Sequence, residues 1–120
     1  MKIVRVDKPY IARSFSFLWL KRIYIGSMYD HLSSAQRQAV LTHEEGHCAL
    51  HHTELRLLTL ILFPFLLKYV CHQTELAADR YVAQRGQGRG LIALMRRTQN
   101  PESFFYPSDK TRCKILTQIA

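Results

Sequence analysis

His43 and His47 flank two adjacent glutamates in the stretch LTHEEGHCALHH, which covers residues 41–52. On a helix, side chains four residues apart stand one turn above each other, so both imidazoles can bind the same metal ion. Glu44 lies about 100° further round the helix, where its carboxylate can hold a water molecule on that ion. The ion lowers the pKa of this water towards ~7, and the glutamate can take the proton and deliver it to a leaving amine. The spacing therefore indicates the active-site helix of a metalloprotease.

Catalytic zinc sites use three protein ligands and leave a fourth position open for water, so the two histidines need a partner. Glu75 and Asp79, in the stretch TELAADRY, are again four residues apart and share one face of a predicted second helix. We expect the Glu75 carboxylate to bind the ion and the Asp79 carboxylate to accept the N–H of a liganding histidine. His72, three residues before Glu75, is the rival ligand. We expect His72 instead at the surface or in contact with a liganding residue rather than with the ion.

The active-site helix has a recognisable start. Ser33 followed by Gln36 is a capping-box signature before a stretch without Pro, so we predict a helix over about 34–52. His51 and His52 would then lie at the helix end or on the surface. Two further helices are predicted downstream, over about 71–84 and 91–99.

Residues 2–28 are rich in β-branched and aromatic side chains that alternate along the chain. This pattern predicts two or three strands, which we expect to form a small antiparallel sheet. A three- to four-helix domain with such a sheet belongs to the α+β class.

The run LRLLTLILFPFLLKYV, residues 55–70, is apolar on all sides and contains Pro64. It is shorter than the roughly 20 residues that a membrane span needs. We therefore predict a hairpin of helices in which Pro64 kinks or ends the first one. Ordinary core is the favoured interpretation of this run, and docking on a membrane surface through residues 57–67 is the alternative.

The composition includes 17 Lys and Arg against 9 Asp and Glu, a formal net charge of +8. Because the basic residues are spread along the chain, we expect a solvated surface rather than a nucleic-acid-binding patch. Three cysteines without CxxC spacing argue against a disulfide framework and indicate a reducing compartment. The N-terminal residues lack the apolar core of a signal peptide, so we expect a cytoplasmic protein, peripheral to a membrane if the apolar run docks there.

The segments AVLTHEEGH and ELAADRY together resemble the gluzincin metallopeptidases of the HtpX, CaaX prenyl protease and BlaR-sensor type. These enzymes have HExxH on one helix and ExxxD on the next, and the resemblance covers about residues 22–97. In length the chain is most similar to the minigluzincins, which reduce that catalytic core to about this size. The resemblance implies these roles: zinc bound by His43, His47 and Glu75, Glu44 as general base and acid, and Asp79 behind a ligand.

Two features of the chain bear on this resemblance. Glu45 departs from the pattern, since relatives usually have an apolar residue there. Minigluzincins are also described with a C-terminal segment that lies in the active-site cleft as a latent form. Here residues 107–120 would be that segment, with Asp109 or Cys113 in the open zinc position. The alternative is a short final helix packed on the core, and the residues leave both interpretations open.

We therefore predict one metallopeptidase domain over residues 1–120 with a zincin-like catalytic core. It would hydrolyse a peptide or protein substrate that pairs with residues 22–30 as an added strand. Arg80, Arg89 and Tyr106 are the candidates for stabilising the oxyanion. The alternative function is a non-catalytic, zinc-stabilised basic module that binds nucleic acid, which gives no role to Glu44.

Overall fold

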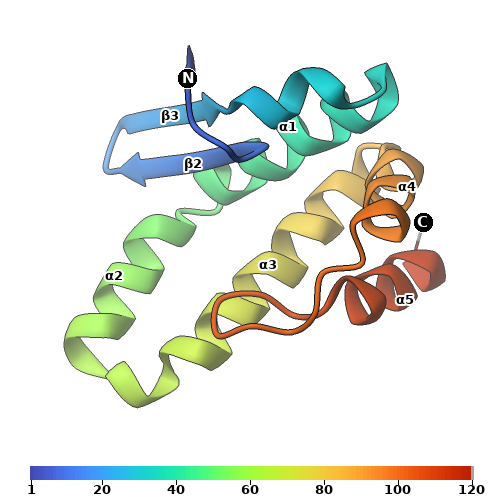
Figure 1. Ribbon diagram of the computed structural model, residues 1–120. Coiled ribbons are helices and arrows are strands. Elements are labelled where there is room, and N and C mark those ends of the chain that lie inside the picture. Colours follow the sequence, from blue (N-terminus) through green and yellow to red (C-terminus); the bar gives the residue numbers. More distant parts are fainter. Residues whose placement is uncertain (120) are drawn as a thin grey trace.

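A three-stranded sheet and five α-helices make up residues 1–119, the part of the chain that the computed structural model describes (Figure 1). The strands are β1 (Lys2–Arg5), β2 (Ala12–Phe17) and β3 (Leu20–Ile25). The helices are α1 (Ser34–Ala49), α2 (His52–Leu62), α3 (Leu67–Gln84), α4 (Gly88–Thr98) and α5 (Asp109–Ile119). Two 3₁₀ helices are Ser27–His31 and Pro64–Leu66. The predicted α+β class is confirmed, but the described helices number five rather than three to four.

β3 is the central strand of the sheet. β1 pairs with it in parallel and β2 pairs with it antiparallel, so the order is β1-β3-β2. The prediction of a purely antiparallel sheet is therefore wrong, because the chain passes from β1 to the opposite edge to form β2 before β3 returns between them. Both edges of β3 are occupied, and residues 27–31 are helical. Because β3 has no free edge and residues 27–31 are not extended, the predicted pairing of a substrate with residues 22–30 is wrong.

α1 begins where the sequence predicts. The Ser33 side chain accepts a hydrogen bond from the Gln36 backbone N–H, and the Gln36 side chain accepts one from the Ser33 N–H, which confirms the capping box. The helix ends at Ala49, earlier than predicted, because His51 adopts a left-handed conformation with a φ of 56°. The chain turns there and begins α2 at His52.

Pro64 ends the first helix of the apolar hairpin, as predicted. α2 stops at Leu62, and α3 starts at Leu67 after the 3₁₀ helix. The hairpin projects from the rest of the molecule (Figure 1). The interpretation of its apolar run as ordinary core is wrong, because the side chains from Leu57 to Leu66 are exposed, with Thr59 as the exception.

The apolar core consists of two clusters that meet α4. The first joins the sheet to α1 and α4 and contains Ile23, Ile25, Tyr29, Leu32, Val40 and Leu94. The second joins α1, α3, α4 and α5 and contains Ala39, Val82, Leu91, Met95 and Leu116. α4 approaches α1 closely at Gly90, where a Cβ would lie 2.5 Å from the Ala35 carbonyl oxygen. Residues 109–119 thus form a packed final helix, which is the fifth helix and one of the two interpretations that the sequence left open.

Candidate metal centre

His43, His47 and Glu75 form one buried cluster between α1 and α3. The Nε2 atoms of the two histidines are 3.1 Å apart. Glu75 Oε2 lies 2.9 Å from His43 Nε2 and 3.3 Å from His47 Nε2. Because each side chain offers one ligand atom to the same point, the cluster could bind a metal ion.

The spacing of these three atoms suits a zinc ion. With bonds of about 2.05 Å, a tetrahedral zinc ion holds its ligand atoms about 3.3 Å apart. The separations of 2.9, 3.1 and 3.3 Å are close to that value, so a small opening of the cluster is enough. Two imidazoles and one carboxylate also form a donor set of catalytic zinc sites that keep one position for water.

The buried carboxylate of Glu75, and that of Asp79 beside the cluster, are stabilised by neighbouring positive charge. Burial by itself raises the pKa of Glu75, but hydrogen bonds with His43 and His47 lower it well below its usual value. Burial lowers the pKa of His43, yet Asp79 and Glu75 raise it more strongly, to about 10. A proton on His43 can therefore balance these carboxylates, and a bound metal ion would replace that proton.

Asp79 lies at the other ring nitrogen of His43. Its Oδ1 is 3.0 Å from His43 Nδ1, close enough for a hydrogen bond but not well aligned for one. Arg112 of α5 donates two hydrogen bonds of 2.8 Å to the Asp79 carboxylate. The same guanidinium lies 3.9 Å from Glu75 Oε2. Arg112 thus fixes Asp79 and connects α5 to the cluster, a contact for which the sequence contains no motif.

His52 lies behind His47 and is the second site residue that the sequence did not indicate. Its Nδ1 is 2.8 Å from His47 Nδ1. Burial, followed by the positive charges of His47 and Arg56, lowers the pKa of His52 to about 4, so it is neutral at pH 7. A neutral His52 can accept the Nδ1–H of His47, which leaves the Nε2 lone pair of His47 for an ion. His52 is at a helix end, as predicted, but it is buried, whereas His51 is exposed.

Arg56 of α2 holds the second oxygen of Glu75. Its Nη2 donates to Glu75 Oε1 at 3.2 Å and to Thr74 Oγ1 at 2.6 Å. This contact leaves Oε2 directed at the two histidines. The apolar sequence around Arg56 gave no reason to expect it at the site.

α1 and α3 approach closely because of Gly46. A Cβ at this position would lie 2.9 Å from the ring of Tyr81, so no side chain fits without a shift. The close contact lets α3 bring Glu75 to the histidines on α1. Glu45, the departure from the family pattern, is exposed, and its carboxylate accepts a hydrogen bond of 3.4 Å from the Tyr81 hydroxyl.

A cavity of about 500 Å³ opens in front of the cluster. Glu44 lines it together with the three cluster residues, and the opposite wall comes from β2, α4, α5 and the loop before α5. Tyr106 of that loop is part of the wall with 46% of its surface exposed, and its pKa is raised by partial desolvation and by the negative charges of Glu75 and Glu44. Its hydroxyl therefore keeps its proton. Arg80 and Arg89, the other oxyanion candidates, are exposed and do not line this cavity.

Three other residues that the sequence offered as candidate metal ligands lie outside the cluster. A ring nitrogen of His72 lies 2.8 Å from the Ser103 carbonyl oxygen, to which it can donate. Asp109 lines the cavity, but its carboxylate accepts hydrogen bonds from Thr98 and from the Asn100 N–H. Cys113 lines a separate cavity. A latent role for residues 107–120 remains a prediction.

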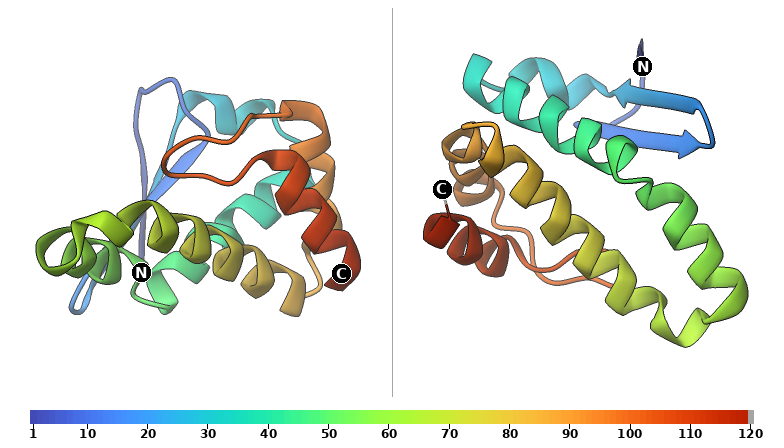
Figure 2. Two further views of the ribbon diagram at one scale, coloured as in Figure 1. Left: turned by 90° about the horizontal axis from the view of Figure 1, so that it is seen from below. Right: turned by 180° about the vertical axis from the view of Figure 1, so that it is seen from behind.

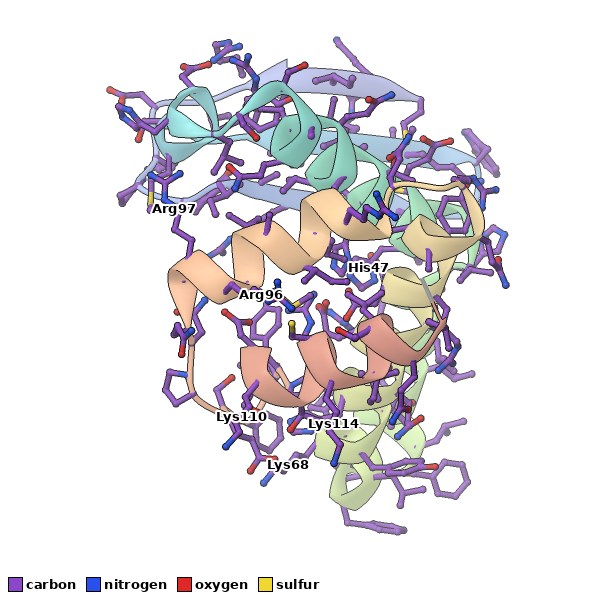
Figure 3. The ribbon with its side chains drawn as sticks, turned by 90° about the vertical axis from the view of Figure 1, so that its right-hand side faces the viewer. His47, Lys68, Arg96, Arg97, Lys110 and Lys114 are labelled. Atoms are coloured by element: carbon purple, nitrogen blue, oxygen red, sulfur yellow. The ribbon has the colours of Figure 1, made fainter. Side chains whose placement is uncertain are left out.

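The separate cavity, of about 550 Å³, lies between α4 and α5 and has a basic wall. Arg96, Lys110 and Lys114 contribute to it, and Figure 3 shows them at the surface while His47 lies in the interior. Three basic residues from two consecutive helices therefore line this cavity, together with Asp109.

Comparison of the chain with protein-family models, with curated proteins and with solved structures finds no match. The function has to be inferred from the side chains of the cluster and its cavity.

Proposed function

We propose that this protein is a zinc-dependent metalloendopeptidase of the gluzincin type. One observation carries the proposal: His43 Nε2, His47 Nε2 and Glu75 Oε2 converge beside a cavity that Glu44 also lines. A purely structural zinc site does not need a further carboxylate beside an open cavity. Hydrolysis does need one, because a general base has to reach the attacking water.

The side chains around the cluster have separate roles in this proposal. A zinc ion would supply a Lewis acid that polarises the scissile carbonyl and acidifies water. Glu44 takes the proton of the attacking water and delivers it to the leaving amine. Tyr106 retains its hydroxyl proton and can donate a hydrogen bond to the developing oxyanion. His52 accepts the Nδ1–H of His47, and the Asp79 carboxylate lies 3.0 Å from His43 Nδ1, so both neighbours favour imidazoles whose Nε2 atoms face the ligand position.

The substrate would add to the free edge of β2. The Ser16 backbone N–H donates to Thr53 Oγ1 at 3.2 Å, so Ser16 faces this edge rather than β3. Antiparallel pairs alternate in their hydrogen bonding, and the backbone groups of Ser14 and Ala12 therefore face the same edge. Both residues line the cavity. An extended peptide paired there would pass beside the ligand cluster.

The decisive experiment compares Glu44→Gln with Glu45→Gln on an unstructured protein substrate. Glu44→Gln removes the base and keeps the proposed ligands, so activity should fall on the order of a hundredfold or more while zinc content persists. Glu45 is adjacent in sequence but exposed, so its variant is a matched control and should retain activity.

Two results would contradict the mechanism. Unchanged activity in Glu44→Gln would remove the proposed base. Loss of zinc together with activity would make Glu44 a ligand.

The basic wall between α4 and α5 favours one second candidate, the zinc-stabilised module that binds nucleic acid. In that case Glu44→Gln leaves nucleic-acid binding unchanged, whereas replacing Lys110 and Lys114 by Gln weakens it and reduces its salt dependence. Failure of the wild-type chain to bind single-stranded or duplex nucleic acid would dismiss this candidate.

A further inference from the structure

α2 has its polar side turned inward and its apolar side turned outward. His52 and Thr59 are buried, and Arg56 is partly buried against Thr74 and Glu75. The exposed side chains of the helix are Leu55, Leu57, Leu58, Leu60, Ile61 and Leu62. A surface helix in water normally shows the opposite arrangement. The inner side of α2 is occupied by groups that contact the metal ligands, so its leucines cannot reach the core.

The exposed apolar surface continues past the end of α2, and we call residues 57–66 the apolar tip. Ile61, at 68%, and Phe65, at 80%, are the most exposed of its large hydrophobic side chains. Single apolar residues at a protein surface are ordinary, but a contiguous set of this kind marks an interaction site.

A second apolar element faces the same way. The turn between β2 and β3 lies on the same side of the molecule as the apolar tip in all the ribbon views (Figures 1 and 2). Leu18 and Trp19 form this turn, and Trp19 is 87% exposed. The two elements offer separate points of contact to one extended, flat partner.

We propose that the apolar tip and Trp19 dock this protein on the surface of an anionic lipid bilayer. Between Leu57 and Leu66 no polar side chain is exposed, since Thr59 is buried and its hydroxyl donates to the Leu55 carbonyl. Protein interfaces carry about one hydrogen bond per 100–200 Å² and include polar groups. A projecting surface of hydrocarbon alone therefore suits acyl chains better than it suits a protein partner.

The charges next to the apolar tip select anionic lipids. Residues 8–29 and 55–74, which contain both contact elements, include no Asp or Glu. Lys68 follows the tip, and Lys21 follows the β2–β3 turn. Glu102 lies 4.0 Å from Lys68, but both side chains are exposed and such pairs contribute little. The basic side chains at the edge of the contact would attract anionic headgroups, and salt should weaken that attraction.

The contact would be shallow. No helix within residues 1–119 has both the length and the apolar character that crossing a bilayer requires. α2 has 11 residues, which makes it about 16 Å long. A helix that lies in the interface sinks only about 5–10 Å, so the outer side of α2 would enter the lipid while its inner side stays against the metal ligands.

Vesicle binding by the full chain tests this inference, which does not depend on peptidase activity. Cosedimentation is measured with phosphatidylcholine vesicles that contain or lack phosphatidylserine. We expect binding to the anionic vesicles that weakens in high salt. Trp19 is the only tryptophan of the chain, so its emission reports this contact alone. It should shift to the blue on binding and be quenched by brominated lipids.

Charged substitutions locate the contact. The double variant Ile61→Glu/Phe65→Glu should bind anionic vesicles about a hundredfold more weakly, at about tenfold for each apolar side chain that leaves the lipid. Ile119→Glu changes an exposed isoleucine on α5 and is the matched control, with wild-type binding expected. Circular dichroism checks that each variant is folded. The Trp19 measurement uses the wild-type chain, so it tests the contact even if a variant does not fold.

Three outcomes would overturn the inference. The first is a wild-type chain that binds neither kind of vesicle. The second is an equal loss of binding in Ile119→Glu. The third is a wild-type dimer that becomes monomeric in Ile61→Glu/Phe65→Glu without any vesicle binding, which would assign the apolar tip to a second copy of the chain.

Discussion

His52 Nδ1 lies 2.8 Å from His47 Nδ1, so the first residue of α2 orients a proposed metal ligand near the end of α1. The left-handed conformation of His51 makes the contact possible, because it turns the chain back towards α1 between the two helices. The end of α1 is therefore part of the site as well as a boundary of the helix.

Replacing His52 should weaken metal binding although it contacts no metal. Loss of a group that orients a liganding histidine typically costs ~10–100-fold in affinity, and we expect a loss of that size for His52→Ala. His51→Asn is the control, because Asn tolerates the left-handed conformation and His51 is exposed. Competition with a zinc-binding dye measures both affinities. Equal affinities in the two variants would show that the contact has no such role.

Glu75→Ala and Asp79→Ala should fail in different ways. Glu75→Ala removes a proposed ligand, so zinc affinity should fall further than in Asp79→Ala. Asp79→Ala leaves the buried Arg112 without its bidentate partner, a defect that typically costs about 3–5 kcal/mol of stability. Metal titration and denaturant unfolding on both variants separate the effects. A greater loss of zinc in Asp79→Ala would make Asp79 the ligand.

Removing the proposed zinc ion should destabilise the chain. Structural zinc sites contribute on the order of 10 kcal/mol, which is comparable to the stability of a whole domain. Elemental analysis should find one zinc per chain, and a chelator should lower the melting temperature. The proposed site would be refuted if the purified chain contained no zinc and a chelator did not change its melting temperature.

Leu116→Ala tests whether α5 is part of the core. Leu116 is 0% exposed within the second core cluster, so its truncation should cost about 2–4 kcal/mol and lower the melting temperature by roughly 10 °C or more. Ile119→Ala truncates an exposed apolar residue on the same helix and should change little. If residues 107–120 instead act as a removable inhibitor, Leu116→Ala should raise activity without a loss of stability.

The contribution of Glu54 to stability should depend on pH. Burial tends to raise the pKa of Glu54, but hydrogen bonds from Ser16 and His51, each 2.6 Å long, lower it overall. A lowered folded-state pKa stabilises the fold above the unfolded value, near 4.5, and this contribution disappears as the pH falls through the folded-state pKa.

Unfolding of Glu54→Gln and wild type over a pH series measures that contribution. The wild type should be the more stable protein at neutral pH, and the difference should vanish in acid. Glu102→Gln changes an exposed carboxylate and is the control. A difference that stays constant with pH would exclude the ionised Glu54 as its source.

Local signals in the sequence predicted several boundaries of the helices. The capping box at Ser33 and Gln36 confines the start of α1 to a few residues, and Pro64 confines the end of α2. Because histidines four apart on a helix share a face, the approach of His43 and His47 also follows from local geometry.

Contacts between distant elements were not predictable in this way. The position of β3 between β1 and β2 depends on how the strands are ordered, and no pattern within one strand encodes that order. Arg112 reaches Asp79 only because α5 folds back over α3, 33 residues later in the sequence. The prediction that the apolar run forms ordinary core was wrong for another reason. Hydrophobic residues usually pack in the core, but the inner side of α2 is occupied by His52 and Arg56.

The pairing of Arg112 with Asp79 has a consequence for how an ion could reach the proposed ligands in the folded protein. Arg112 belongs to the last helix, and its guanidinium contacts Asp79 and lies 3.9 Å from Glu75 Oε2. Local opening of one segment costs less free energy than unfolding of the whole domain. A local opening of α5 would therefore uncover this side of the cluster while α1 and α3 keep the two histidines and Glu75 together.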